Sequence, residues 1–372
     1  MLSGLLPTLA LRYNNLFFKV LILALSGKIN SEKLKKPTIL DIAKELNITF
    51  STVARALNDH PAISASTKKA VRETADRLNY RQNKIASSLR SGRSNIIGVI
   101  VPNLHVSFFS SVVSGIERVM NNNGYNILLY QSNESKKHES KGIETFLQSR
   151  VDGIISSVTT ETDSNIYQEI KSRNMPLIFF DRELSELNVS SVTIDDYKGG
   201  FIATEHLIKQ GYKNILHITA HQEIAIFKER LRGYIDALKH YNLPVKEELI
   251  IKGNFSLEFG KEVVRQTRLQ GINYDAIFAL EDYTAMGAMQ ALKELRIKVP
   301  EEIGIIGFAN EAFGSLVSPA LSTIDQQTAK MGEETARLFL NQLKNESQPG
   351  DPEKLVLEPI LIIRESSNRI NT

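Results

Sequence analysis

From Ile96 onward, short apolar runs alternate with segments whose apolar residues recur at helical spacing. The runs are IIGVIV (96–101), YNILLY (125–130), VDGIISSV (151–158), PLIFFD (176–181), SVTID (191–195), NILHIT (214–219), DAIFAL (275–280) and IGIIGF (303–308). Continuous apolar strands separated by helices are typical of parallel sheets covered on both faces. The pattern is longer than one open sheet needs. We therefore predict two doubly wound lobes, with ligand-binding side chains just after the strands.

Residues 37–80 have a different pattern, with three short bursts of helical apolar spacing. Their inward residues are Ile39, Ile42, Ala43 and Leu46, then Val53, Ala56 and Leu57, then Ala70, Val71, Thr74 and Leu78. Thr49 or Ser51 can cap the second burst, and Ser64 or Ser66 the third. Only three residues separate the first two bursts, so the spacing predicts a helix-turn-helix.

The charge is distributed unevenly along the chain. Residues 28–95 hold 14 lysines and arginines against six acidic residues, whereas residues 96–372 have a net charge of −7. A small basic segment on an acidic body is typical of a nucleic-acid-binding head with a separate sensor, although a basic solvated face fits the charge equally well. The chain has no cysteine, which excludes disulfides and thiolate zinc sites.

Two segments flank the helical head. Residues 1–36 contain LFFKVLILALSG (16–27), which is too short to span a membrane and is interrupted by Lys19. We interpret this arm as disordered or as a start-site artefact, with a secretory signal as the alternative. Residues 83–95 form a polar, basic hinge with a short helix at 84–90. Leu89 has no obvious core to join there, so it suits a minor-groove wedge, or else packs on its own core.

No catalytic set is present. The chain lacks a G-x-S-x-G elbow, a P-loop, a G-x-G-x-x-G loop and an HExxH pair, so we predict no enzyme and no cofactor. His217 and His221 are four residues apart, but they lie across a strand end rather than on one helix face. We therefore predict no metal site.

Several motifs together carry a resemblance to a known family. TILDIAKELNITFSTVARALN, NKIASSLRSGRSNIIGVIVPN, FFDR (179–182), ERLRGY (229–234), EDYTAMGAMQAL (281–292) and SPALSTID (318–325) occur in this order. The chain resembles the LacI-type (lactose-repressor) family of bacterial transcription regulators over residues 38–367. The resemblance implies a helix-turn-helix head, a hinge helix, a periplasmic-binding-protein-like (type I) core, and a homodimer on a pseudo-palindromic DNA operator.

The second helical burst is the predicted DNA reader. Ser51 and Arg55 are four residues apart and share one helix face, and an arginine in the major groove can contact guanine bidentately. Phe50 can press on a thymine methyl or on the sugar-phosphate wall. The resemblance implies that Phe50, Ser51 and Arg55 read bases. It places the other contacts near phosphates or in the hinge: Thr49, Thr52, Asn58, Ser64, Thr67, Tyr80, Asn83, Ala86 and Leu89. The hinge departs from the family at Ser87, where the family commonly has arginine.

Candidate effector-binding residues come from strand ends and neighbouring helices: Phe108, Phe109, Asp181, Arg230, Glu281, Asp282 and Asn310. Aromatic faces suit a sugar ring, and a carboxylate accepts hydroxyl hydrogen bonds. The family often has asparagine at the position of Glu281, and two aspartates at the positions of Ala309 and Asn310. The effector expected is a carbohydrate or its derivative, whose identity these departures leave open.

Our prediction is a cytoplasmic, ligand-responsive repressor without a membrane partner; the alternative is an exported periplasmic sugar-binding protein. The predicted domains are the arm (1–36), the helix-turn-helix domain (37–82), the hinge (83–95) and the core (96–367). The first lobe is expected over about 96–193 and 322–349, and the second over about 194–321 and 350–367.

Overall fold

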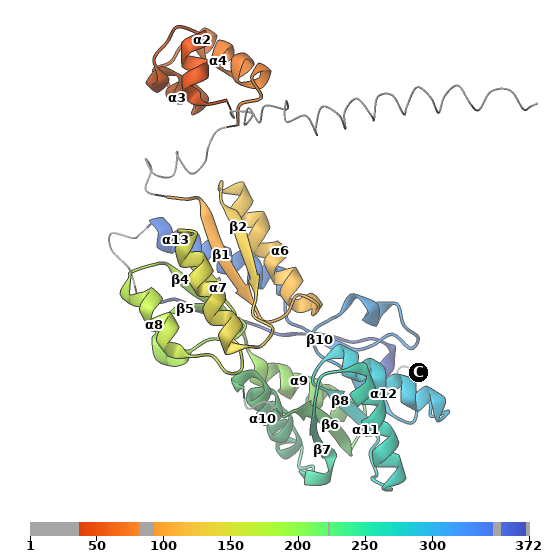
Figure 1. Ribbon diagram of the computed structural model, residues 1–372. Helices are drawn as coiled ribbons and strands as arrows, with labels where there is room; N and C mark the ends of the chain where they lie inside the picture. The colour runs from red at the N-terminus through yellow and green to blue at the C-terminus, as the bar shows by residue number, and fades with distance from the viewer. Residues whose placement is uncertain (1–36, 82–92, 222–223, 345–350, 370–372) are drawn as a thin grey trace, which may run out of the picture. The chain divides into compact units, whose positions relative to one another are not determined.

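The computed structural model describes residues 37–81, 93–221, 224–344 and 351–369 (Figure 1). The chain forms two compact units, a small helical head and a larger α/β core. Asn83, Ala86 and Leu89, the predicted hinge helix and the N-terminal arm lie outside the described residues.

The head consists of three short helices, α2 (Ile39–Glu45), α3 (Phe50–Leu57) and α4 (Ala65–Arg77). Ile42, Val53, Ala56 and Val71 are fully buried and form its core. The Thr49 side chain caps α3 by accepting a hydrogen bond from the Thr52 backbone N–H at 3.2 Å. The predicted helix-turn-helix is confirmed.

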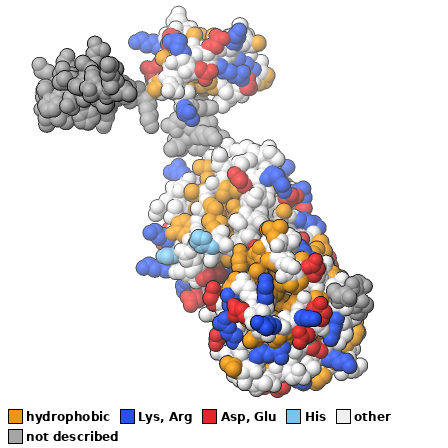
Figure 2. Space-filling model, turned by 90° about the vertical axis from the view of Figure 1, so that its right-hand side faces the viewer, with side chains coloured by type: hydrophobic (Ala, Val, Ile, Leu, Met, Phe, Trp, Pro, Cys, Tyr) orange, Lys and Arg blue, Asp and Glu red, His pale blue; other side chains and the backbone are white. Residues whose placement is uncertain are grey.

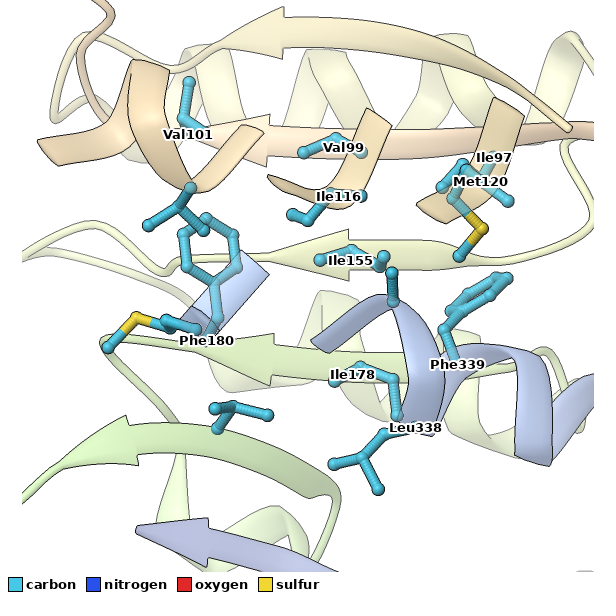
Figure 3. Close-up of a cluster of buried hydrophobic side chains, with 14 of the residues drawn as sticks. Ile97, Val99, Val101, Ile116, Met120, Ile155, Ile178, Phe180, Leu338 and Phe339 are labelled. Atoms are coloured by element: carbon cyan, nitrogen blue, oxygen red, sulfur yellow. The ribbon is translucent and has the colours of Figure 1, made fainter. Parts of the chain in front are cut away.

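The first lobe of the core is a six-stranded parallel sheet in the order β11-β5-β4-β3-β1-β2. Its strands are β1 (Ile96–Val101), β2 (Asn126–Gln131), β3 (Ile154–Ser156), β4 (Leu177–Phe180), β5 (Ser190–Ile194) and β11 (Lys354–Leu357). Helices α6 (Ser107–Asn122) and α13 (Thr328–Lys344) cover one face, and α7 (Lys136–Gln148) and α8 (Ser164–Ser172) cover the other. Figure 3 shows side chains of α6 and α13 meeting those of β1, β3 and β4.

The second lobe is a four-stranded parallel sheet in the order β7-β6-β8-β9. Its strands are β6 (Ile215–Ala220), β7 (Ile250–Gly253), β8 (Ala276–Ala279) and β9 (Gly304–Ile306). Helices α9 (Asp196–Lys209) and α10 (Ala225–His240) cover one face, and α11 (Leu257–Leu269) and α12 (Asp282–Glu294) cover the other. Short 3-10 helices complete the core: η1 (Ser185–Leu187), η2 (Glu247–Leu249), η3 (Ala312–Ser315) and η4 (Glu365–Ser367). The predicted pair of doubly wound lobes is confirmed.

The chain passes between the lobes three times, and the last two passages correct the expected lobe boundaries. β10 (Thr323–Asp325), expected in the first lobe, pairs with β12 (Ile360–Ile362), and Ile324 is buried in the core of the second lobe. β11, expected in the second lobe, instead pairs in parallel with β5 of the first. Strand pairing places both strands, because β10 pairs with β12 and β11 pairs with the edge strand β5. Hydrophobic periodicity in the sequence carries no information about which strand edges pair.

Candidate functional site

The outward face of α3 presents polar and aromatic side chains to solvent. Phe50 is 59% exposed, and Ser51 and Arg55 are exposed as well, whereas Val53 and Ala56 point into the head core. A large aromatic side chain in solvent contributes nothing to the head core. The three predicted base-reading residues therefore share one exposed helix face.

Arg55 differs from the other arginines of the helical part of the head. Arg72 forms a salt bridge with Asp59, and Arg77 forms one with Glu45, which links α4 to α2. The Arg55 guanidinium has no hydrogen-bond or salt-bridge partner among residues 37–81, 93–221, 224–344 and 351–369. Its five N–H donors are free for an external acceptor.

The predicted phosphate-contacting residues lie at helix ends. The Thr49 hydroxyl bonds those of Ser51 (2.8 Å) and Thr52 (2.9 Å) at the start of α3. At the start of α4, the Ser64 hydroxyl bonds that of Thr67 at 2.8 Å. Two further residues complete this set, Asn58 as the C-cap of α3 and Tyr80 packed against the head core. The start of each helix carries the positive end of the helix dipole, which favours anions.

Arg230 is the centre of the second lobe's candidate site. It is only 5% exposed; its Nε donates to Asp196 Oδ1 at 2.8 Å, and its guanidinium donates to the Leu280 carbonyl at 3.1 Å. The guanidinium carbon also lies 3.6 Å from the centroid of the Phe308 ring. Burial raises the pKa of Asp196 to about 6, and the Arg230 charge opposes that rise. Gly200 lets the backbones of α9 and α10 approach closely at Arg230, because a Cβ there would collide with the Arg230 carbonyl.

On the first lobe, Asp181 directly follows β4 and is buried, with φ +60°. Burial raises its pKa, and the charges of Arg182 and Arg230 oppose the rise, so the carboxylate lies within electrostatic range of the second lobe. Among the described residues, the one uncharged hydrogen-bond partner of its side chain is Ser157 Oγ at 3.4 Å. The neighbouring Arg182 donates to both carboxylate oxygens of Glu134, at 2.8 and 3.0 Å.

Glu281 and Asp282 begin α12 after β8. Glu281 caps the helix by accepting from the backbone N–H groups of Tyr283 and Thr284. Asp282 is fully buried and accepts from the Glu311 N–H and the Thr323 hydroxyl, both at 2.7 Å. Burial raises its pKa to about 7, an effect that the negative charges of Glu281 and Glu311 reinforce.

The remaining predicted effector residues are placed differently. Phe108 and Phe109 are buried at the start of α6, with ring centroids 5.0 Å apart at 88°. The Arg182 guanidinium lies 5.9 Å from the Phe109 ring centroid. The Asn310 side chain is taken up by Asp325 and Arg364, so it is not joined to the carboxylates of α12.

Two residues that join the lobes were not identified from the sequence, Ser107 and Glu311. Ser107, in the first lobe, donates its hydroxyl hydrogen bond to Glu311 in the second lobe, so this pair joins the lobes directly. In the sequence, Glu311 could have been identified as a candidate from its position immediately after the predicted residue Asn310. Arg182 was likewise present in the FFDR motif, but only its bonds to Glu134 show what it does.

His217 is a core residue. Its ring stacks between Tyr234 and Phe278, with centroids 4.8 and 4.6 Å away. Among the described residues, no cluster of three or more histidines and carboxylates is arranged to hold a metal ion. The described helices also include none long and apolar enough for a membrane span.

Comparisons with known proteins agree with this architecture. Residues 38–83 match a family model described as bacterial regulatory proteins, lacI family. Residues 94–354 match the model of periplasmic binding proteins and the sugar-binding domain of the LacI family. The HTH-type transcriptional regulator DegA of Bacillus subtilis (strain 168) is 32% identical over 339 residues, covering 91% of this chain and all of the relative.

Two solved structures are similar over most of the chain. The CelR transcriptional regulator in complex with cellobiose is 26% identical, with a TM-score of 0.67, covering 89% of this chain and 99% of that one. The lac repressor dimer bound to operator and the anti-inducer ONPF has a TM-score of 0.80, covering 90% of this chain and 99% of that one. At 23% identity, this second likeness concerns the fold alone.

Proposed function

Because the chain belongs to the LacI family of bacterial regulatory proteins, we propose that its head reads a pseudo-palindromic DNA operator and that its core senses a carbohydrate or carbohydrate derivative. The chain is a ligand-responsive transcription regulator, and the proposal concerns what it binds and through which residues. The observation that carries it is Arg55, an exposed arginine on the outward face of α3 that has no partner within the part of the chain that the structure describes.

Arg55, Ser51 and Phe50 are proposed as the base readers. A helix of this size fits the major groove, and a bidentate arginine–guanine pair contributes about 1–3 kcal/mol of discrimination. Thr49, Thr52, Asn58, Ser64, Thr67 and Tyr80 are proposed to contact or orient phosphates, as the two helix starts favour anions. Asn83, Ala86 and the wedge residue Leu89 stay predictions from the sequence.

The effector is proposed to bind where the lobes meet, near Asp181, Arg230 and Glu311. Two arginines near this region are already bonded to carboxylates, Arg182 to Glu134 and Arg230 to Asp196. Asp181, Glu281 and Glu311 add further carboxyl groups to this region. An uncharged polyhydroxyl ligand can donate to these carboxylates, whereas an anionic sugar would be repelled. The CelR relative's cellobiose is a ligand of this uncharged type.

Control is proposed to act through the balance between lobe arrangements. An effector that binds one arrangement more tightly shifts the population of the operator-binding form. A full reversal needs a difference in affinity of about 10⁴-fold. The Ser107–Glu311 hydrogen bond between the lobes is a contact whose presence depends on that arrangement.

A second copy of this chain is the proposed partner in DNA binding. Hydrophobic side chains gather in the middle of the core on the face seen in Figure 2. The exposed apolar residues of the core include Leu316, which is 84% exposed, and Tyr283, whose ring centroid lies 4.8 Å from that of Phe313. Exposed apolar surface of this kind marks protein–protein contacts.

DNA binding also supports a cytoplasmic, non-enzymatic role and leaves the exported alternative without support.

The test is selection of DNA sites from a random library by the purified full-length chain. The wild type should enrich one palindromic sequence. Arg55→Ala should lose preference at one symmetric pair of positions by about ten- to a hundredfold. The control is Arg72→Ala, which removes a positive charge that is paired with Asp59 inside the head. Unchanged base preference in Arg55→Ala would refute the base-reading assignment.

A further inference from the structure

The second lobe carries a groove that is separate from the residues described above. Its volume is about 500 Å³, and it lies between α10 and the ends of β6 and β7. Thr219 of β6 and Lys252 of β7 are paired neighbours in the sheet and form one side. The opposite side is formed by α10 residues alone: Phe227, Lys228, Leu231, Arg232, Ile235, Asp236 and Lys239.

The groove combines an apolar floor with a cationic rim. Ala220, Phe227, Leu231 and Ile235 supply the apolar surface. Four cationic side chains line the groove against one carboxylate: Lys228, Arg232, Lys239 and Lys252 against Asp236. This excess is opposite in sign to the net charge of −7 over residues 96–372.

The cationic side chains of the groove differ in whether they have hydrogen-bond or salt-bridge partners within the protein. Arg232 bonds Glu229 and stacks over Tyr197, and Lys239 lies 3.9 Å from Asp236. Lys252 is exposed and has no hydrogen-bond or salt-bridge partner among residues 93–221, 224–344 and 351–369. An unpaired ammonium facing an apolar floor is positioned to bind an anion.

Helical geometry separates this groove from the Arg230 cluster. With 3.6 residues per turn, Lys228, Arg232 and Lys239 lie on the side of α10 away from Arg230. Arg230 is buried on Phe308, whereas Arg232 is an exposed groove residue. One helix therefore serves two different environments.

We propose that this groove is a second small-molecule site, which takes an organic anion with an apolar or aromatic body, such as an aryl or acyl phosphate or carboxylate. The anion binds at the rim near Lys252, and the body lies along Leu231 and Ile235. Occupation contacts α10, the helix that holds Arg230. The site is independent of the effector proposed for the region between the lobes.

Isothermal titration calorimetry of the full-length chain tests the proposal with phenyl phosphate as the probe. Phenyl phosphate should bind, and inorganic phosphate and phenol should each bind at least about tenfold more weakly, because each lacks one of the two features. Binding of phenyl phosphate should weaken as salt is raised. Absence of phenyl phosphate binding, or equal binding of inorganic phosphate, overturns the proposal.

Substitutions at two groove residues, with a matched control elsewhere on the lobe, locate the site. Lys252→Glu should weaken phenyl phosphate about tenfold, and Asp236→Asn should strengthen it about two- to fivefold. The matched control is Lys293→Glu, the same change at an exposed position of α12 on the opposite face of the sheet, which should leave the affinity unchanged. Equal effects of Lys252→Glu and Lys293→Glu would mean that general charge, and not the groove, binds the anion.

Discussion

Arg55 in the head and Arg230 in the core carry the same charge but are placed in opposite ways. Arg55 is exposed and has no partner among the described residues, whereas Arg230 is buried and bonded to Asp196 and the Leu280 carbonyl. The surface of the head is ready for an external acceptor. The core site is completed by its own groups, so a ligand there must compete with contacts already made.

Because the two arginines differ in this way, we expect Arg55 to matter for DNA binding and Arg230 to matter for the stability of the fold. Removing a side chain that has no internal partner changes little in the fold, whereas removing half of a buried ion pair leaves a charge uncompensated. The same substitution at the two arginines should therefore affect different measurements.

The largest expected effect is that of Arg230→Met. Asp196 is only 6% exposed and would lose its charged partner. The unfolding free energy of the core should therefore fall by about 3–5 kcal/mol. Urea denaturation followed by far-UV circular dichroism measures this change.

A matched control for Arg230→Met is available in the same lobe. Arg265 pairs with Glu294 at 2.7 Å, but both side chains are about half exposed. Arg265→Met should lower the unfolding free energy by less than about 1 kcal/mol. Equal losses in the two variants would remove the distinction drawn between buried and exposed arginines.

Asp282 should give an intermediate and pH-dependent effect. Burial raises its folded-state pKa to about 7, above its ordinary value of 3.8. Between these values the folded state holds a proton that the unfolded state has lost, so this carboxyl's contribution to stability is complete at low pH and is lost as pH rises through 7. The slope is about 1.4 kcal/mol per pH unit for one such group.

The Asp282→Asn variant isolates this contribution, because asparagine does not titrate. The wild type's stability relative to the variant should decrease as the pH rises from about 4 to about 7 and then level off. Subtracting the two urea-denaturation series cancels the titration of His206 and His217, whose pKa values burial lowers to about 4 in both proteins. A difference that is constant between about pH 4 and about pH 7 would show that folding does not raise the pKa of Asp282.

The sequence predicts most of the fold because its strongest signals are local. Apolar periodicity placed β1, β6 and α3, and the short connection that contains Asn47-Ile48-Thr49 fixed the relation of α2 to α3. The pairing of β11 with β5 was missed, because it joins residues about 160 positions apart through backbone hydrogen bonds. Such pairing depends on which sheet edge is open and leaves no periodic signal.

The site residues divide in the same way. Exposure of Phe50, Ser51 and Arg55 follows from the helical period alone, once Val53 and Ala56 are buried. In the core, the sequence identified Arg230 and Asp282 as candidates but could not show that Asp196, Glu311 and Thr323 bond to them. Those partners come from different strands and helices, so only the tertiary fold brings them together.

The smallest expected effect is that of Arg55→Ala on the stability of the head. No internal partner is lost, so protection of the Val53 and Ala56 amides against hydrogen exchange should correspond to a free energy within about 0.5 kcal/mol of the wild type. Arg77→Ala, which breaks the Arg77–Glu45 contact between α4 and α2, should lower that free energy by up to about 1 kcal/mol. A loss above about 1 kcal/mol in Arg55→Ala would make Arg55 a structural residue. Its exposure on α3 would then no longer favour DNA recognition over folding.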